Sequence, residues 1–451
     1  MTHWVDQSVF YHIYPLGLCG VLRADDCTQK PEHPLNKLYP WLDHIAGMGF
    51  NALYLGPHFE SVYHGYDTTD YYKVDRRLGT NADLAALTDY AHRLGIRVIF
   101  DAVFNHVGRQ HFAFQDLLRN LQNSEYADWF AKVDFNQNNK HNDGFKYSCW
   151  QDHETLVNLN LAHPGVQEHL LGAVKQWVED YHIDGLRLDA ANVMDLGFLS
   201  KLAEFSHALK PQFWLLGEVA DGNFPLFANP ERLDSVTNYE SFPALYRSFN
   251  DKNMFDISWS LNRLFGPQGS CKDLTLYSFA DNHDVNRVAS LLQNPQHLLP
   301  LYVLMFSMPG VPSIYYGSEF GIRGEKNPGD EPLRPALALS ELQQDPDKQR
   351  LIEPLKKLIR AKRELPALQT GVYHQLHLAN KQFAFSRECE QGFALTTINA
   401  ADTPAQIHLD LPGGYSGCLK DILQPESVFS GENGALSLVL EPNSARLLIP
   451  A

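Results

Sequence analysis

The sequence predicts an α/β chain built as a (β/α)₈ barrel, with a small insertion and a separate β-rich domain at the end. Three observations lead to this prediction. Short apolar runs of strand length alternate with helical periodicity over residues 9–316. The alternation is interrupted at residues 107–160, and after Leu365 short strand-like runs follow one another. Alternating strands and helices are typical of a parallel sheet, and eight such units close into a TIM barrel.

The expected barrel strands are short, and several are apolar along their whole length, as strands buried on both faces should be. They are Val9–Tyr14, Ala52–Gly56, Val98–Phe104, Gly185–Ala190, Phe213–Val219, Ser235–Asn238, Leu276–Asp281 and Ser313–Tyr316.

Helical periodicity is clearest in Asp83–Leu94 and Val166–Tyr181, where Gly95 can end the first helix and Pro164 can begin the second. The apolar run Leu298–Tyr316 has the length of a membrane span but contains three prolines. A buried helix followed by a buried strand explains it better.

These patterns divide the chain into four segments. We expect residues 1–106 to form the first part of the barrel and residues 107–160 a domain inserted after strand three. Residues 161–365 complete the barrel, and residues 366–451 form an antiparallel β-sandwich. Six aromatic residues between Trp129 and Trp150 argue against a disordered insertion.

Composition limits the partners. The chain has 37 Lys and Arg against 53 Asp and Glu, a net charge of −16, and no basic run, which excludes nucleic acid and anionic membrane surfaces as expected partners. The N-terminus lacks a signal-peptide pattern, so we expect a cytoplasmic protein with reduced thiols. The cysteines show no Cys-x-x-Cys pair and therefore no zinc or redox motif; they are Cys19, Cys27, Cys149, Cys271, Cys389 and Cys418.

Four short blocks carry groups that can donate a proton, accept one or attack carbon. They are Asp101–His106, Gly185–Asp189, Gly217–Val219 and Asp281–Asp284. Most follow an expected strand, and a parallel barrel builds its active site from the carboxyl ends of its strands. The carboxylates in the last three blocks, Asp189, Glu218 and Asp284, are the catalytic candidates.

In this order the blocks resemble the signature regions of the α-amylase superfamily, glycoside hydrolase family thirteen. Leu156–Asn160 is similar to the segment before strand four in neopullulanases and cyclomaltodextrinases, and His64–Tyr71 to the family's segment after strand two. The resemblance covers roughly residues 5–450 and makes the insertion the family's domain B. The first expected strand begins close to Met1, so we expect the N-terminal β domain of these relatives to be missing.

The resemblance implies a retaining glycosidase that cleaves α-1,4-glucosidic bonds in maltooligosaccharides, cyclodextrins or related short α-glucans. Asp189 would be the nucleophile, Glu218 the acid/base, and Asp284 a stabiliser of the transition state. Arg187 lies two residues before Asp189, on the same face of the strand, and should keep that carboxylate ionised. The resemblance further implies substrate-binding residues, which are Tyr66, Asp101, His106, Arg187, His283, Asp330 and Arg334.

The family's usual calcium site is incomplete in this sequence. It uses the residue at Asn105 and a histidine shortly after the nucleophile, but the segment Asp189–Val193 contains no histidine. We therefore expect no metal ligands and no required cofactor; calcium at a non-standard site is the alternative.

Two other functions stay open. An α-glucanotransferase, or a sucrose- or trehalose-type relative, would use the same carboxylates. A catalytically silent glucan-binding scaffold is a third interpretation, against which the retention of all three carboxylates with Arg187 argues. The expected partner is an α-glucan oligosaccharide, and the sequence predicts no oligomeric state. Motifs for nucleotides, for a serine nucleophile or for a zinc protease are absent from the sequence.

Overall fold

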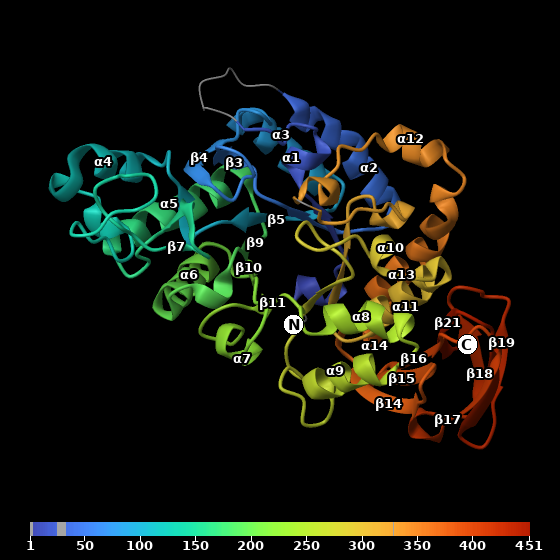
Figure 1. The fold of residues 1–451 in the computed structure, drawn as a ribbon. Helices are drawn as coiled ribbons and strands as arrows, with labels where there is room; N and C mark the ends of the chain where they lie inside the picture. The colour runs from blue at the N-terminus through green and yellow to red at the C-terminus, as the bar shows by residue number, and fades with distance from the viewer. Residues whose placement is uncertain (1–2, 25–32, 328) are drawn as a thin grey trace.

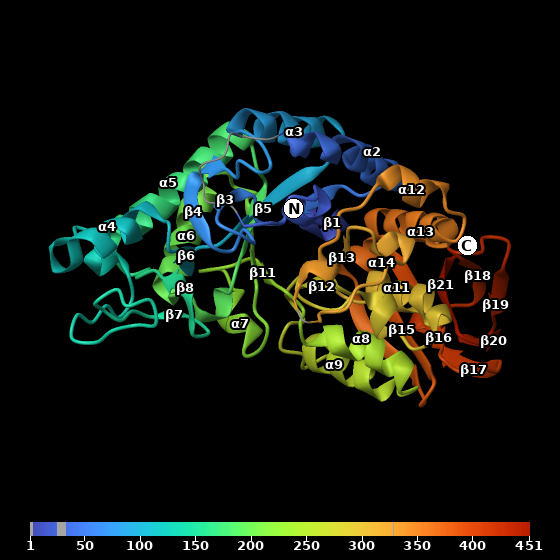
Figure 2. The ribbon, with the colours of Figure 1, turned by 45° about the horizontal axis from the view of Figure 1, so that its top comes forward.

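A computed structural model describes residues 3–24, 33–327 and 329–451. Its centre is a parallel sheet of eight strands in the order β11-β10-β9-β5-β2-β1-β13-β12 (Figures 1 and 2). A parallel bridge between Thr237 and Tyr277 joins the two ends of this order and closes the barrel. The strands are β1 (Phe10–Ile13), β2 (Ala52–Leu55), β5 (Arg97–Ala102), β9 (Gly185–Leu188), β10 (Trp214–Gly217), β11 (Ser235–Val236), β12 (Tyr277–Phe279) and β13 (Val311–Tyr315).

The eight predicted barrel strands are confirmed in position and order, although most are shorter than expected. The difference matters at the carboxyl ends, where Asp189 and Glu218 follow β9 and β10 instead of ending them. Their backbone amides still donate to Ala102 and Leu188 at 3.1 and 2.9 Å. Both carboxylates therefore stand on anchored backbone just beyond the sheet.

Helices cover the outside of the barrel (Figures 1 and 2). The longer ones are α2 (Leu38–Met48), α3 (Asn81–Arg93), α5 (Pro164–Tyr181), α6 (Leu196–Leu209), α8 (Ser241–Asn250), α9 (Phe255–Phe265), α11 (Leu298–Ser307) and α13 (Ile352–Glu364). The shorter ones are α1 (Pro15–Leu18), α7 (Phe224–Phe227), α10 (Val288–Leu291) and α12 (Leu339–Gln344).

The residues predicted to begin or end helices do so in the structure. Pro164 is the first residue of α5, and Gly95, just past α3, has a left-handed φ of 76°. The apolar run from Leu298 forms α11 and then β13, both buried. No helix in the described parts of the chain is both long and apolar enough to cross a bilayer.

The insertion is an ordered domain at the opposite end of the molecule from the C-terminal strands (Figures 1 and 2). It contains β6 (His106–Gly108), α4 (Phe112–Asn120), β7 (Cys149–Trp150) and β8 (His153–Asn158), and its strands pair in the order β6-β8-β7. Aromatic packing supplies its core, because the Phe114 ring lies within 6.1 Å of the rings of Phe130, Phe145 and Tyr147. We call this insertion domain B.

A second excursion follows β2 and was not predicted as a structural unit. The antiparallel hairpin of β3 (Phe59–Ser61) and β4 (Thr68–Val74) carries the segment His64–Tyr71 in and before its second strand. Its base is fixed by the buried Arg77, which donates to the Asp75 carboxylate at 2.8 Å.

The chain ends in an antiparallel β domain, as predicted. Six strands form one sheet in the order β14-β15-β16-β21-β18-β19, and β17 pairs with β20 across a shared apolar core. A short helix, α14 (Pro366–Thr370), precedes the strands and was not predicted. The strands are β14 (Val372–Leu378), β15 (Gln382–Cys389), β16 (Gly392–Asn399), β17 (Ala405–Asp410), β18 (Gly417–Asp421), β19 (Val428–Gly431), β20 (Ala435–Leu440) and β21 (Ser444–Pro450).

Two buried cations fasten this domain to the barrel. The ammonium group of Lys362, on α13, donates to the carbonyls of Gly310 and Leu368 at 2.9 and 2.7 Å. The guanidinium of Arg387, on β15, donates to Ser307 at 3.1 Å. Both side chains are almost fully buried, so each needs these carbonyls as a replacement for water.

The described cysteines are free thiols. They are Cys19, Cys149, Cys271, Cys389 and Cys418, and Cys27 lies outside the described residues.

A buried carboxylate, Asp184, bonds to several groups at the end of the barrel where the strands begin. Its oxygens accept from Arg97 and Lys210 at 2.8 Å and from the Val98 amide at 2.9 Å, and contact His92 at 3.0 Å. Burial alone would raise the pKa of Asp184, but these hydrogen bonds and charges lower it well below its usual range.

We therefore expect Asp184→Asn to destabilise the protein at neutral pH. A carboxylate with a lowered folded pKa stabilises the fold above its unfolded pKa of about 3.9, and that contribution is lost as the pH falls through the folded value. The variant should lose about 1.5–3 kcal/mol at pH 7, and the gap should narrow at acidic pH. Unfolding midpoints across pH test this, with the exposed Asp180→Asn as control. Equal midpoints at pH 7 would contradict the assignment.

Candidate active site

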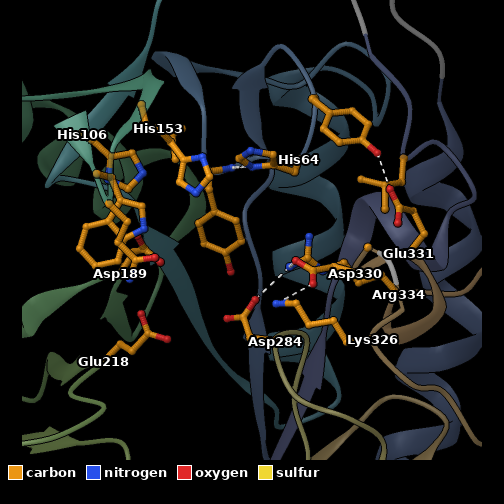
Figure 3. Close-up of a pocket in the computed structure, with 17 residues that line it drawn as sticks. His64, His106, His153, Asp189, Glu218, Asp284, Lys326, Asp330, Glu331 and Arg334 are labelled. Carbon is orange, nitrogen blue, oxygen red and sulfur yellow. Dashed lines mark hydrogen bonds and ion pairs between the residues drawn. The ribbon is translucent and has the colours of Figure 1, made fainter.

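A cleft of about 590 Å³ opens where the barrel strands end, between domain B and the loop after β13 (Figure 3). Seven of the ten residues predicted for the site line it. They are Tyr66, His106, Asp189, Glu218, Asp284, Asp330 and Arg334.

The other three, Asp101, Arg187 and His283, lie beneath the cleft with at most 3% of their surface exposed. Arg187 bonds to Asp101 and to Asp189, and His283 pairs with Asp284, so all three orient residues that line the cleft. That they also bind substrate stays a prediction.

The centre of the site is the Arg187 guanidinium. Its Nη1 donates to Asp101 at 2.8 Å and to Asp189 at 2.9 Å, and its Nη2 pairs with Glu218 at 2.7 Å. One planar cation therefore holds three carboxylates from three adjacent strand ends in a fixed relation. Strands β9 and β10 are paired in parallel with Leu188 opposite Gly217, which places Asp189 and Glu218 side by side.

Glu218 is held from its other side by the backbone. Its Oε2 accepts from the Ala190 amide at 3.0 Å, and its Oε1 lies 3.4 Å from the Tyr239 hydroxyl. Ala190 adopts a left-handed φ of 51°, a conformation that is uncommon for a residue with a Cβ atom. The turn after Asp189 thus directs a backbone donor at the neighbouring carboxylate.

Ionisation of the carboxyl pair differs from the prediction. Burial raises the pKa of Asp189 well above its usual value, Arg187 lowers it, and the charge of Glu218 raises it again. Arg187 was expected to keep Asp189 ionised, but its charge is divided among three carboxylates. The excess negative charge around Arg187 therefore favours the protonated form of Asp189.

Asp284 faces this pair from the loop after β12 and is more exposed. It pairs with Arg334 Nη2 and with His283 Nε2, each at 2.9 Å. Burial opposes ionisation, but His283 and Arg334 together hold the pKa of Asp284 well below its usual range. Asp284 is therefore a fixed negative charge and carries no proton into the cleft. Arg334 also pairs with Asp330 at 3.0 Å.

Aromatic hydroxyls support the buried carboxylate Asp101. Its Oδ2 accepts from Tyr54 at 2.7 Å and from Tyr66 at 3.0 Å, and Tyr66 also contacts His283. The Tyr66 ring lines the cleft while its hydroxyl is tied to this network, so it offers a fixed flat surface to a sugar.

On the side of domain B, His106 stacks on Trp150 with ring centres 6.0 Å apart. Burial, with a smaller contribution from His64, lowers the pKa of His106 to about 4, so the imidazole is neutral near pH 7. A neutral imidazole can exchange hydrogen bonds with sugar hydroxyls without adding charge to the site.

Further residues line the cleft that sequence reasoning did not assign to the site. They are Leu22, Tyr63, His64, Trp150, Gln151, His153, Leu156, Lys326, Gly329 and Glu331. His64 and Leu156 lie in the two segments that resemble family regions, so that resemblance could have marked them as residues of the site. Of the others, Trp150 and His153 belong to the strands β7 and β8 on either side of a two-residue turn. The rest lie in loops and short turns, where no periodicity marks which side chains face inward.

The described residues do not fit a metal ion. No three His, Cys, Asp or Glu side chains in the described ranges gather in a way that could hold one. Asn105, the family's usual ligand position, places its amide nitrogen 3.5 Å from Asn158 Oδ1 and 3.3 Å from His106 Nδ1. Val193, after the nucleophile block, is 52% exposed and offers no ligand.

Comparison with known proteins agrees with this geometry. Residues 35–362 match the model of the alpha amylase catalytic domain. A cyclomaltodextrinase from Thermoanaerobacter pseudethanolicus is 31% identical over 465 aligned positions, which cover 99% of this chain and 78% of the relative. Neopullulanase 2 from Thermoactinomyces vulgaris is 30% identical, with the same shares covered.

The chain belongs to the α-amylase family. A solved cyclomaltodextrinase structure, 27% identical, superposes with a TM-score of 0.84 over 99% of this chain and 78% of the other. This family member is therefore a glycosidase of the α-amylase type, related to cyclomaltodextrinases and neopullulanases, and its domain B and C-terminal β domain belong to the shared fold.

The three-way contact of Arg187 predicts a strong effect of Arg187→Lys. A lysine ammonium is a compact charge and cannot hold Asp101, Asp189 and Glu218 in one plane. We expect kcat to fall by about 100-fold or more, because misplaced catalytic groups cost on that scale, and the pH profile to shift. Initial rates across pH on a maltooligosaccharide measure both. The exposed Arg360→Lys is a matched control, and near-normal turnover of Arg187→Lys would show that the shared contact is dispensable.

Proposed function

We propose that the protein is a retaining hydrolase of α-1,4-glucosidic bonds in short α-glucans, such as maltooligosaccharides or cyclodextrins. The observation that carries this proposal is the pair of carboxylates, Asp189 and Glu218, on adjacent parallel strand ends with one shared cation. The names of the similar proteins, cyclomaltodextrinase and neopullulanase, support the choice of an α-glucan substrate.

In the first step Glu218 donates a proton to the glycosidic oxygen while Asp189 attacks the anomeric carbon. Substrate binding favours this arrangement, because the glycosidic oxygen can only accept a hydrogen bond and so favours the protonated form of Glu218. In this state Glu218 carries the proton, and Asp189 is ionised beside Arg187. The leaving sugar departs with the proton, and a glucosyl–Asp189 ester remains.

In the second step Glu218, now ionised, takes a proton from an incoming water whose oxygen attacks the same carbon. Asp189 leaves as a carboxylate, and Glu218 is protonated again. Asp284, fixed by His283 and Arg334, stabilises positive charge on the sugar ring by its negative charge and accepts from ring hydroxyls.

A second candidate function is glucanotransfer, in which a sugar hydroxyl replaces water in the second step. The observation that favours it is Val193, an apolar residue 52% exposed that follows directly on the nucleophile turn.

We expect Asp189→Asn and Glu218→Gln each to lower kcat by several orders of magnitude, since each removes a group that forms or breaks a bond. Both variants should fold, because each substitution is isosteric. Turnover of maltotriose and circular dichroism test this, with Asp221→Asn, an exposed residue just past Glu218, as control. Near-wild-type turnover by either variant would remove it from the proposed mechanism.

The stereochemistry of the product gives an independent prediction. Neighbouring strands lie about 4.8 Å apart, whereas an inverting enzyme needs its carboxyl groups about 6.5–9.5 Å apart to admit a water. The first product should therefore be the α-anomer, and transfer products should appear at high substrate concentration. Proton NMR before mutarotation measures the anomer, and an initial β-anomer would rule out double displacement.

Chelation should have little effect on activity, since we propose that no metal ion takes part. Treatment with EDTA should leave the rate on maltotriose and the thermal midpoint within error of the untreated protein. Loss of activity that is restored by calcium, and not by magnesium, would reveal a calcium site.

A further inference from the structure

Two loops are in contact at one end of the cleft. The Tyr63 hydroxyl, in the connection between β3 and β4, donates to Glu331 Oε1 at 2.7 Å. Glu331 begins a short helical turn, η8 (Glu331–Leu333), in the segment after β13. Both side chains line the cleft, and Figure 3 shows Glu331 beyond Asp330 and Arg334 as seen from Glu218.

Tyr63 is held rigidly on its side of this contact. Its amide donates to Asp67 Oδ2 at 2.9 Å, and its carbonyl accepts from Arg77 Nη1 at 2.6 Å. Arg77 is buried and paired with Asp75, so it cannot move without breaking the base of the hairpin. The Tyr63 ring therefore has a fixed place at the cleft.

A second buried arginine holds the other side. Arg287 donates to the carbonyl of Leu333 at 2.8 Å, within η8, and to that of Tyr316 at 2.7 Å, just past β13. Asp330, next to Glu331, is held by Arg334 at 3.0 Å and by Lys326 at 2.8 Å. Because both loops are anchored to the barrel, the contact is a wall and not a mobile lid.

The wall lies away from the catalytic pair. Asp189 and Glu218 both lie on the side of His106 and His153 of domain B (Figure 3). Asp284, Asp330 and Arg334 extend in the opposite direction, toward Glu331.

We propose that the Tyr63–Glu331 pair determines chain-length specificity by closing the cleft on the non-reducing side. This inference rests on the proposed function and deepens it. The enzyme then cleaves linear α-glucans near their non-reducing ends and releases short saccharides. A long chain cannot thread through the cleft, so internal bonds of polymers, and the rings of cyclodextrins, which have no end, are poorer substrates than linear maltooligosaccharides.

Ionisation keeps the contact closed near neutral pH. The hydrogen bond raises the pKa of Tyr63 and lowers the pKa of Glu331, so the pair stays a neutral hydroxyl against a carboxylate. The wall therefore does not titrate in the range where the catalytic carboxyl groups work.

The test compares Tyr63→Ala and Glu331→Ala with wild type on maltotriose and on maltoheptaose labelled at its reducing end. The ratio of kcat/KM for maltoheptaose over maltotriose should rise about tenfold in both variants, since removing a steric exclusion gives selectivity changes on that scale. The unlabelled fragments should also become longer. Tyr90→Ala, which removes a similar tyrosine–carboxylate bond to Asp43 on the outer helices, should keep the wild-type ratio.

An unchanged ratio and unchanged fragment lengths in folded Tyr63→Ala and Glu331→Ala would overturn the inference while leaving the proposed function intact. If Tyr63→Ala does not fold by circular dichroism, Glu331→Ala decides the question, because it opens the same wall without touching the hairpin. A wild-type protein inactive on every α-glucan would overturn the proposed function, and this inference with it.

Discussion

The site depends on one electrostatic constraint: a single buried guanidinium faces three carboxylates. Arg187 is held in place by Asp101 and Asp189, which both bond to its Nη1. Its single positive charge cannot neutralise these two carboxylates and Glu218 together. The excess negative charge favours the protonated form of Asp189 and raises its pKa, together with burial. The site can therefore carry out acid/base chemistry because three carboxylates face only one guanidinium.

The rest of the fold serves to hold this cluster. Parallel strand ends bring Asp189 and Glu218 together, and the left-handed turn at Ala190 supplies a further donor to Glu218. The hydroxyls of Tyr54 and Tyr66 fix Asp101, and His283 and Arg334 fix Asp284. Glu218 and Asp284 are therefore each oriented by two or more contacts, and Asp189 by its bond to Arg187, before a substrate arrives.

Sequence reasoning succeeded where a local pattern determines structure. Buried strands are continuously apolar, and the blocks at Asp189 and Glu218 follow them directly, so barrel and carboxylates could be predicted together. It failed where position depends on distant loops: Tyr63 and Glu331 are 268 residues apart and lie outside any periodic segment. It also foresaw only part of the role of Arg187. The pair with Asp189, two residues away along the chain, is visible in the sequence, whereas the pairs with Asp101 and Glu218 at neighbouring strand ends are not.

The buried cations at the junction with the C-terminal domain limit how the two domains can be exchanged in evolution. Lys362 and Arg387 place charges from both units in an interior where only backbone carbonyls of the junction can solvate them. Separating the units would take the Leu368 carbonyl from Lys362 and the Ser307 carbonyl from Arg387, and would leave each cation one acceptor, Gly310 or Gly371. Such a junction resists exchange of modules by recombination, so barrel and β domain should be inherited as one piece.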